Sequence, residues 1–199
     1  KATEVIAIEL HSDQIVGFFD ISVSNIQGRY ILADYIAERA RAHDGEIVLA
    51  SADAGGGKRL EKMASRLLRK YDIDVPLVFA HKTRVKDNEV SEMKIIGDVK
   101  DKHVIFLDDM LDTGGTLCAA ADAVIVHGAK STEGAVIHLV GSGNAVQNIE
   151  NSSLETLMST NTLPTPEHPK FKVISVAPEI GKAIISSAYG ISFNRLQES

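Results

Sequence analysis

The chain has 199 residues with a formal net charge of -6 at pH 7, and 44% of them are hydrophobic. This length can bury a full core as one domain, and no run of 18 or more apolar residues occurs that would predict a membrane span. The acidic balance argues against nonspecific binding of nucleic acid. One cysteine, Cys118, cannot form an internal disulfide, so we expect a cytoplasmic protein in a reducing compartment.

The first predicted element is a largely apolar strand over residues 4–10, directly before His11. Glu9 precedes this histidine by two positions, and residues at i and i+2 of a strand point to the same side, so the two side chains could share one cation. A lone histidine at a strand end is more often structural, which leaves both interpretations open. A helix is predicted next, over residues 29–43.

A second strand, over residues 46–51, leads through a glycine-rich turn into an amphipathic helix over residues 56–71. The turn consists of Asp53, Ala54, Gly55 and Gly56. Glycines let the backbone approach an anion closely, and the free N–H groups of the following helix can bind it. Such a turn is a weak signal by itself, since packing alone could explain it.

The third predicted strand covers residues 75–80 and is followed by a polar loop over residues 82–88. Lys82 and Arg84 are the cations of this loop. Taken alone, they indicate a solvated basic loop, as most exposed clusters of lysine and arginine do.

The most informative segment joins a strand over residues 103–107 to a helix over residues 115–127. The turn between them contains Asp108, Asp109, Asp112, Thr113, Gly114, Gly115 and Thr116. Glycines and a helix N-terminus suit a phosphate, whereas three carboxylates suit hydroxyl groups or Mg²⁺. The pattern therefore indicates a phosphorylated sugar, and the alternative is a simple turn in which Asp112 or Thr113 caps the helix.

Further strands are predicted over residues 133–139, 154–159 and 171–176, with helices over residues 143–150 and 178–187. Strands that alternate with helices favour an α/β fold with a central parallel sheet flanked by helices. The carboxyl edge of such a sheet is where open α/β folds bind ligands.

The segment over residues 104–116 resembles the sugar-phosphate loop of the type I phosphoribosyltransferase fold. Residues 10–21, 51–59 and 81–90 resemble, in the same order, three segments of the C-terminal portion of ribose-phosphate pyrophosphokinases, also called phosphoribosyl diphosphate synthetases. The first segment, Leu-His-x-x-Gln-Ile-x-Gly-Phe-Phe-Asp, is the most specific, because phosphoribosyltransferases that act on a base lack it.

The resemblance implies transfer of the β,γ-diphosphoryl group of MgATP to ribose 5-phosphate. It implies that Lys82 and Arg84 are catalytic and that the loop over residues 108–116 binds ribose 5-phosphate. It also implies that residues 53–56 hold the diphosphate. The implied metal ligands for Mg²⁺ are His11, Asp53, Glu9 and Asp20. The partners are then ATP and ribose 5-phosphate, in a homo-oligomer built from dimers into hexamers.

Departures from the family pattern concern its metal site and its length. Glu9 stands where aspartate is usual, Ala52 replaces a proline, and Ser22 and Ser24 replace a proline and an aspartate. Family chains are around half as long again. We therefore expect residues 1–25 to end a missing N-terminal domain, residues 26–176 to form the phosphoribosyltransferase-like domain and residues 177–199 to be a tail.

Two alternatives remain open at the level of the sequence. A noncatalytic regulatory subunit associated with a phosphoribosyl diphosphate synthetase would keep the fold, and Ser24 and the missing half favour it. A phosphoribosyltransferase acting on a base would need a hood over the base, which the sequence does not reveal.

Overall fold

The computed structural model describes residues 2–44, 46–83, 92–193 and 196. Its main feature is a seven-stranded sheet in the order β5-β4-β3-β6-β7-β8-β9. All neighbouring strands pair in parallel except β4 and β5, which are antiparallel. The strands are β3 (Ile47–Ser51), β4 (Leu77–Thr83), β5 (Glu92–Ile96), β6 (His103–Leu111), β7 (Ser131–Leu139), β8 (Leu154–Thr160) and β9 (Phe171–Ile174).

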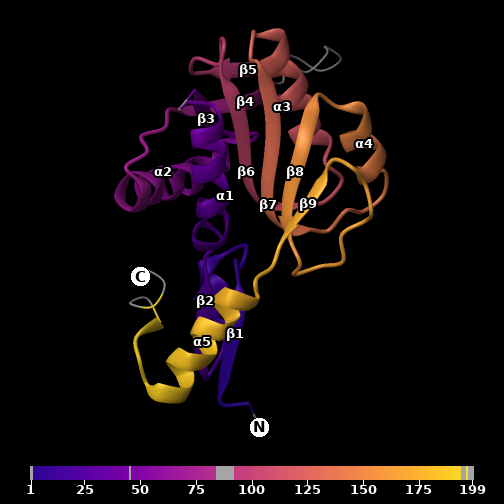
Figure 1. Cartoon of the computed structure of the whole chain (residues 1–199). Helices are drawn as coiled ribbons and strands as arrows, with labels where there is room; N and C mark the ends of the chain where they lie inside the picture. The colour runs from indigo at the N-terminus through magenta and orange to yellow at the C-terminus, as the bar shows by residue number, and fades with distance from the viewer. Residues whose placement is uncertain (1, 45, 84–91, 194–195, 197–199) are drawn as a thin grey trace.

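Helices cover both faces of the sheet (Figure 1). On one face, α1 (Arg29–Ala42) and α2 (Gly57–Tyr71) bury a cluster that includes Ile36 and Leu60 against β3, β6 and β7. On the other face, α3 (Gly115–Val126) and α4 (Ala145–Asn151) enclose a second cluster around Phe106. The strands between these layers are apolar on both sides, as expected for a parallel sheet.

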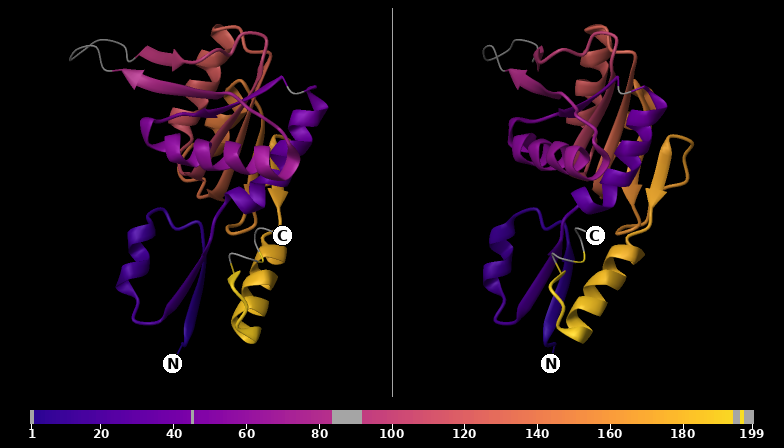
Figure 2. Two further views of the ribbon diagram at one scale, coloured as in Figure 1. Left: turned by 90° about the vertical axis from the view of Figure 1, so that its left-hand side faces the viewer. Right: turned by 60° about the vertical axis from the view of Figure 1, so that its left-hand side comes forward.

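A separate two-stranded parallel sheet lies below the main sheet, formed by β1 (Glu4–Ile8) and β2 (Ser22–Ile26). A 3-10 turn, η1 (Asp13–Phe18), lies between the two strands in the chain. The C-terminal helix α5 (Ala177–Tyr189) follows β9 and returns to contact β2. Figure 2 shows α5 in this lower part, near β1 and β2. The predicted tail over residues 177–199 therefore contains a helix. The predicted division into domains stays a prediction.

The predicted α/β class and the alternation of strands and helices are confirmed, with differences at particular elements. The sequence reasoning missed β2, where serines alternate with apolar residues, and β5, a charged edge strand. Strand β6 continues to Leu111, so Asp108 and Asp109 lie within it instead of in a turn. Strand β4 reaches Thr83, which places Lys82 in a strand paired with Met93 instead of in a loop.

The parallel pairing of β3 with β6 determines where the functional loops meet. Val48 pairs with Val104 and Ala50 with Phe106, so both strands run toward the same edge. The turn after β3 and the end of β6 therefore lie side by side at the carboxyl edge, where α/β folds bind ligands.

A buried ion pair lies away from that edge, near the start of β7. Glu133, whose side chain is 5% exposed, accepts hydrogen bonds from Arg39 Nε at 3.0 Å and from the Tyr35 hydroxyl at 2.6 Å. Close by, the His43 and His103 rings stack with centroids 3.6 Å apart. Among the described residues, no helix is long and apolar enough to cross a membrane.

Candidate functional site

The loop between β6 and α3 has the geometry of an anion site. Gly114 has a φ of 75°, a left-handed conformation that favours glycine, and it starts the turn into α3. Thr113, Gly115 and Thr116 are exposed around it. The N–H groups of the first turn of α3 therefore remain available to a negatively charged ligand.

Two side-chain contacts hold this loop in place from the segment that follows β7. The Ser142 hydroxyl donates to Asp112 Oδ1, and Asn148 Nδ2 donates to the Thr113 carbonyl oxygen at 2.8 Å. The predicted sugar-phosphate residues from Asp112 to Thr116 are thus held in one loop with a defined conformation, and Asp108 and Asp109 lie just before it in β6.

The turn after β3 is packed too tightly for any residue but glycine at one position. A Cβ added to Gly56 would clash with Ser51 Oγ and lie only 2.8 Å from Ser51 Cβ. Gly56 N–H donates to Asp53 Oδ1 at 2.8 Å, so Asp53 caps the short 3-10 turn η2 (Ala54–Gly56). Asp53 is nevertheless exposed, which leaves its carboxylate accessible to a ligand.

One pocket joins the two loops. Its lining consists of Ala52, Asp53, Asp108 and the continuous segment from Met110 to Leu117. The turn predicted to hold a diphosphate and the loop predicted to hold a sugar phosphate therefore face the same space. This arrangement allows one ligand, or two adjacent ligands, to contact both.

The two aspartates at the end of β6 form a charged network with Arg59 and His11. Arg59 Nη1 donates to Asp108 Oδ1 and its Nη2 to Asp109 Oδ1, both at 2.8 Å. His11 Nδ1 lies 2.6 Å from Asp109 Oδ2. The sequence reasoning missed Arg59, because only the folded chain brings α2 next to β6.

This network separates the pKa values of the two aspartates. Burial and the adjacent Asp109 carboxylate raise the pKa of Asp108 to about 7. Burial also acts on Asp109, but hydrogen bonds with Asp108 and His11 and the charge of Arg59 outweigh it and lower the pKa of Asp109. Asp109 therefore keeps its negative charge to lower pH than Asp108 does.

The four predicted metal ligands lie in different surroundings. The Glu9 carboxylate accepts the Gly28 N–H, and Glu9 itself has a positive φ of 41°. The His11 side chain is 70% exposed and Asp20 is exposed. Within the described residues, no group of three or more His, Cys, Asp or Glu side chains is arranged to hold a metal ion.

The predicted catalytic cations are located only in part. Lys82 lies near the end of β4, next to β3 in the sheet, and Arg84 lies outside the described residues. The structure therefore leaves both assignments as predictions.

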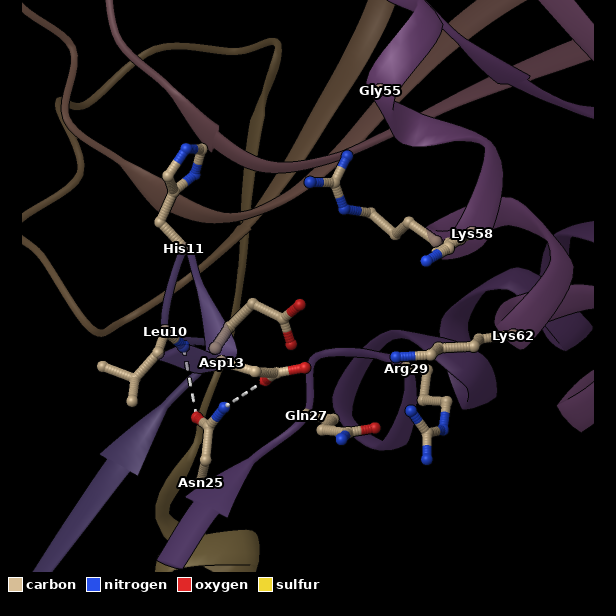
Figure 3. Close-up of a pocket in the computed structure, with 11 residues that line it drawn as sticks. Leu10, His11, Asp13, Asn25, Gln27, Arg29, Gly55, Lys58 and Lys62 are labelled. Atoms are coloured by element: carbon tan, nitrogen blue, oxygen red, sulfur yellow. Dashed lines mark hydrogen bonds between the residues drawn. The ribbon is translucent and has the colours of Figure 1, made fainter. Parts of the chain in front are cut away.

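A second pocket is lined by the segment after β1 together with residues of β2, α1 and α2 (Figure 3). Arg29, Lys58 and Lys62 line it from the helices, while His11 and Asp13 lie on the side of the N-terminal strands. The Asn25 Oδ1 accepts a hydrogen bond from Leu10 N–H at 3.1 Å, which joins β2 to the segment after β1. His11 and Arg59 of the charged network also line this pocket, in which the basic side chains outnumber the acidic side chains of Glu9 and Asp13.

Comparison with known proteins assigns the chain to a family. The profile of the phosphoribosyl transferase domain family matches residues 22–168. The chain belongs to this family. The matched range contains the turn over residues 53–56 and the loop over residues 108–116, so the family assignment covers both loops of the shared pocket.

Individual relatives agree with the resemblance found in the motifs. A ribose-phosphate pyrophosphokinase of Streptomyces avermitilis is 40% identical over 188 residues, which cover 92% of this chain and 56% of the relative. Ribose-phosphate pyrophosphokinase A of Dictyostelium discoideum is 41% identical over 196 residues, which cover 96% of this chain and 59% of the relative.

A solved structure of phosphoribosylpyrophosphate synthetase from Mycobacterium smegmatis superposes with a TM-score of 0.82 at 35% identity. The match covers 95% of this chain and 60% of that one. The predicted phosphoribosyltransferase-like fold is thereby confirmed. In all three comparisons the chain spans little more than half the length of its relative.

Proposed function

We propose that the protein transfers the diphosphoryl group of MgATP to the C1 hydroxyl of ribose 5-phosphate, which gives phosphoribosyl diphosphate and AMP. The observation that carries this proposal is the single pocket lined by both Asp53 and the segment from Met110 to Leu117. Relatives about 40% identical are named for this activity, which favours an enzyme over a noncatalytic regulatory subunit.

The sugar phosphate would occupy the loop between β6 and α3. Its phosphate would accept hydrogen bonds from Thr113, Thr116 and the N–H groups around Gly115, where the helix dipole favours negative charge. Asp108 lines the same pocket and would accept hydrogen bonds from the ribose hydroxyl groups.

The diphosphate would lie on the turn over residues 53–56, on the opposite side of the pocket. The C1 oxygen would form a bond to the β-phosphorus while the bond from that phosphorus to the oxygen shared with the α-phosphate breaks. AMP leaves with that oxygen, and the hydroxyl proton passes to solvent. Lys82 and Arg84 would neutralise the charge that develops on the phosphate oxygens.

The residues of the pocket fit Mg²⁺ that arrives with ATP. Magnesium is usually bound by one or two carboxylates together with substrate phosphates and water, so it needs no cage of protein ligands. Asp53 and His11, both exposed beside the pockets, would hold it, with Glu9 and Asp20 as outer acidic groups. When bound, the ion would neutralise phosphate charge.

The complete protein would act as a cytoplasmic homo-oligomer, from dimers to hexamers. Support comes from the lower part of the structure, where a two-stranded sheet too small to be stable alone lies with η1 and α5, which carry exposed apolar side chains. Phe18 is 87% exposed there, and Tyr189 on α5 is 77% exposed.

Calorimetric titration of the purified complete protein with ribose 5-phosphate tests the assigned site. Binding is expected for the wild type in the presence of Mg²⁺. Asp112→Ala should weaken it by about tenfold, because this change removes a carboxylate that shapes the loop. A matched control is Asp74→Ala, which removes another exposed aspartate that does not line the pocket. No heat from a folded wild-type sample would contradict the assignment.

A further inference from the structure

Arg59 physically connects the two loops of the candidate site. It lies in the first turn of α2, three residues after Gly56, and its guanidinium reaches the end of β6. Two hydrogen bonds of 2.8 Å join it to two different carboxylates, Asp108 and Asp109. A planar guanidinium can make two such bonds at once in a fixed geometry, whereas an ammonium group cannot.

The two carboxylates differ in what they can offer a ligand. Both oxygens of Asp109 are engaged, one by Arg59 and the other by His11, and its side chain is 6% exposed. Asp109 is not among the residues that line the shared pocket. Asp108 does line that pocket, and its side chain is 26% exposed.

Without a cation, two adjacent carboxylates at this depth would repel each other. Charges in a partly buried site interact much more strongly than in water, and a buried charge without a partner is costly. Arg59 supplies the opposing charge and also fixes the direction of Asp108, whose Oδ1 additionally accepts the Asp109 N–H at 2.9 Å.

We propose that Arg59 is a positioning residue for the sugar-phosphate site, which keeps Asp108 aimed into the shared pocket, and that Asp109 is its buried anchor and not a ligand of the sugar. The inference deepens the proposed function and rests on it, because the ligand of the pocket is assigned there. It revises the sequence-based assignment of Asp109 as a residue that binds ribose 5-phosphate.

The test measures both ribose 5-phosphate affinity by calorimetry and steady-state kinetics on the complete protein with Mg²⁺. Arg59→Ala should raise the Kd and the KM for ribose 5-phosphate on the order of tenfold, while the KM for ATP changes by less than about threefold. Arg59→Lys should recover part of the affinity, because it keeps the charge and loses the double hydrogen bond. Arg69→Ala, an exposed arginine of the same helix, is the matched control and should bind like the wild type.

A double-mutant cycle separates this role from a general effect on folding. If Arg59 positions Asp108 only while Asp109 holds it, adding Arg59→Ala to Asp109→Asn should change the Kd for ribose 5-phosphate by less than about twofold. A purely structural role would lower the folded fraction in thermal melts and leave the Kd of the folded molecules unchanged.

The outcomes distinguish this inference from the proposed function. The inference would be overturned if folded Arg59→Ala bound ribose 5-phosphate with the wild-type Kd. It would also be overturned if the fold-changes in Kd of Arg59→Ala and Asp109→Asn multiplied in the double variant. If Arg59→Ala does not fold, the Kd of Arg59→Lys is measured instead. An unchanged Kd for ribose 5-phosphate in Arg59→Lys would then overturn the inference. If the wild type binds ribose 5-phosphate but releases no AMP, the proposed function fails while the Kd comparison still decides the role of Arg59. If the wild type binds no ribose 5-phosphate, both fail.

Discussion

Replacing Glu133 by alanine should destabilise the protein without altering its site. The change leaves the Arg39 guanidinium and the Tyr35 hydroxyl without the carboxylate that accepts from both. Breaking a buried ion pair by removing one partner costs about 3–5 kcal/mol. Because the Arg39 side chain is 29% exposed and water can replace part of the loss, we expect about 3 kcal/mol, at the lower end of that range.

Urea denaturation followed by circular dichroism measures this free energy of unfolding, with an unchanged denaturant slope as the sign that only stability has changed. Glu150→Ala is the matched control, since Glu150 is an exposed glutamate on α4. It should change the free energy of unfolding by less than about 0.5 kcal/mol.

Ribose 5-phosphate affinity should be unchanged in folded Glu133→Ala. Glu133 pairs in register with Ile105, near the start of β6, whereas the candidate site lies at the other end of that strand. A loss of stability below about 1 kcal/mol, or a weakened sugar phosphate site in the folded variant, would refute the reasoning.

Three further predictions follow from other parts of the structure. Gly56→Ala should lower the rate of AMP formation by at least about tenfold, because the added Cβ would displace the turn. Gly181→Ala is the control, since an added Cβ there meets open space. Equal rates of AMP formation for Gly56→Ala and the wild type would contradict the prediction. Light scattering at micromolar concentration should give an oligomer, and a monomer would oppose the proposed assembly. Burial and the neighbouring His43 lower the pKa of His103, so the unfolded chain binds a proton that the folded one lacks, and stability should fall as the pH drops below about 6.5. His103→Gln should weaken that dependence in melts from pH 5 to pH 8, and an identical pH dependence would contradict it.

The sequence predicted best those features that depend on neighbouring residues. The loop from Asp108 to Thr116 was recognisable because strand, carboxylates, glycines and helix follow each other directly. The turn over residues 53–56 was recognisable for the same reason, and the parallel pairing of β3 and β6 then brought both loops to one edge.

Features that depend on distant contacts were missed. Strand β2 pairs only with β1 among the described residues. Ser22 and Ser24 alternate with its apolar residues, so the segment lacks the continuous apolar run that marks a buried strand. No pattern in the sequence distinguishes Arg59 from the other arginines, because its contacts with Asp108 and Asp109 span about fifty positions. Glu133 begins the strand predicted over residues 133–139, but its burial against Arg39 depends on a contact across 94 positions.

The most direct test of the central claim is to identify the nucleotide released from ATP by the complete protein. Transfer of a diphosphoryl group predicts AMP, formed in equal amounts with phosphoribosyl diphosphate and only when ribose 5-phosphate and Mg²⁺ are both present. Lys82→Ala should lower this rate sharply and leave ribose 5-phosphate affinity nearly unchanged, since a cation that acts on the transition state contributes mainly to the rate. Release of ADP, no release of nucleotide, or a Lys82→Ala variant as fast as the wild type would contradict the account.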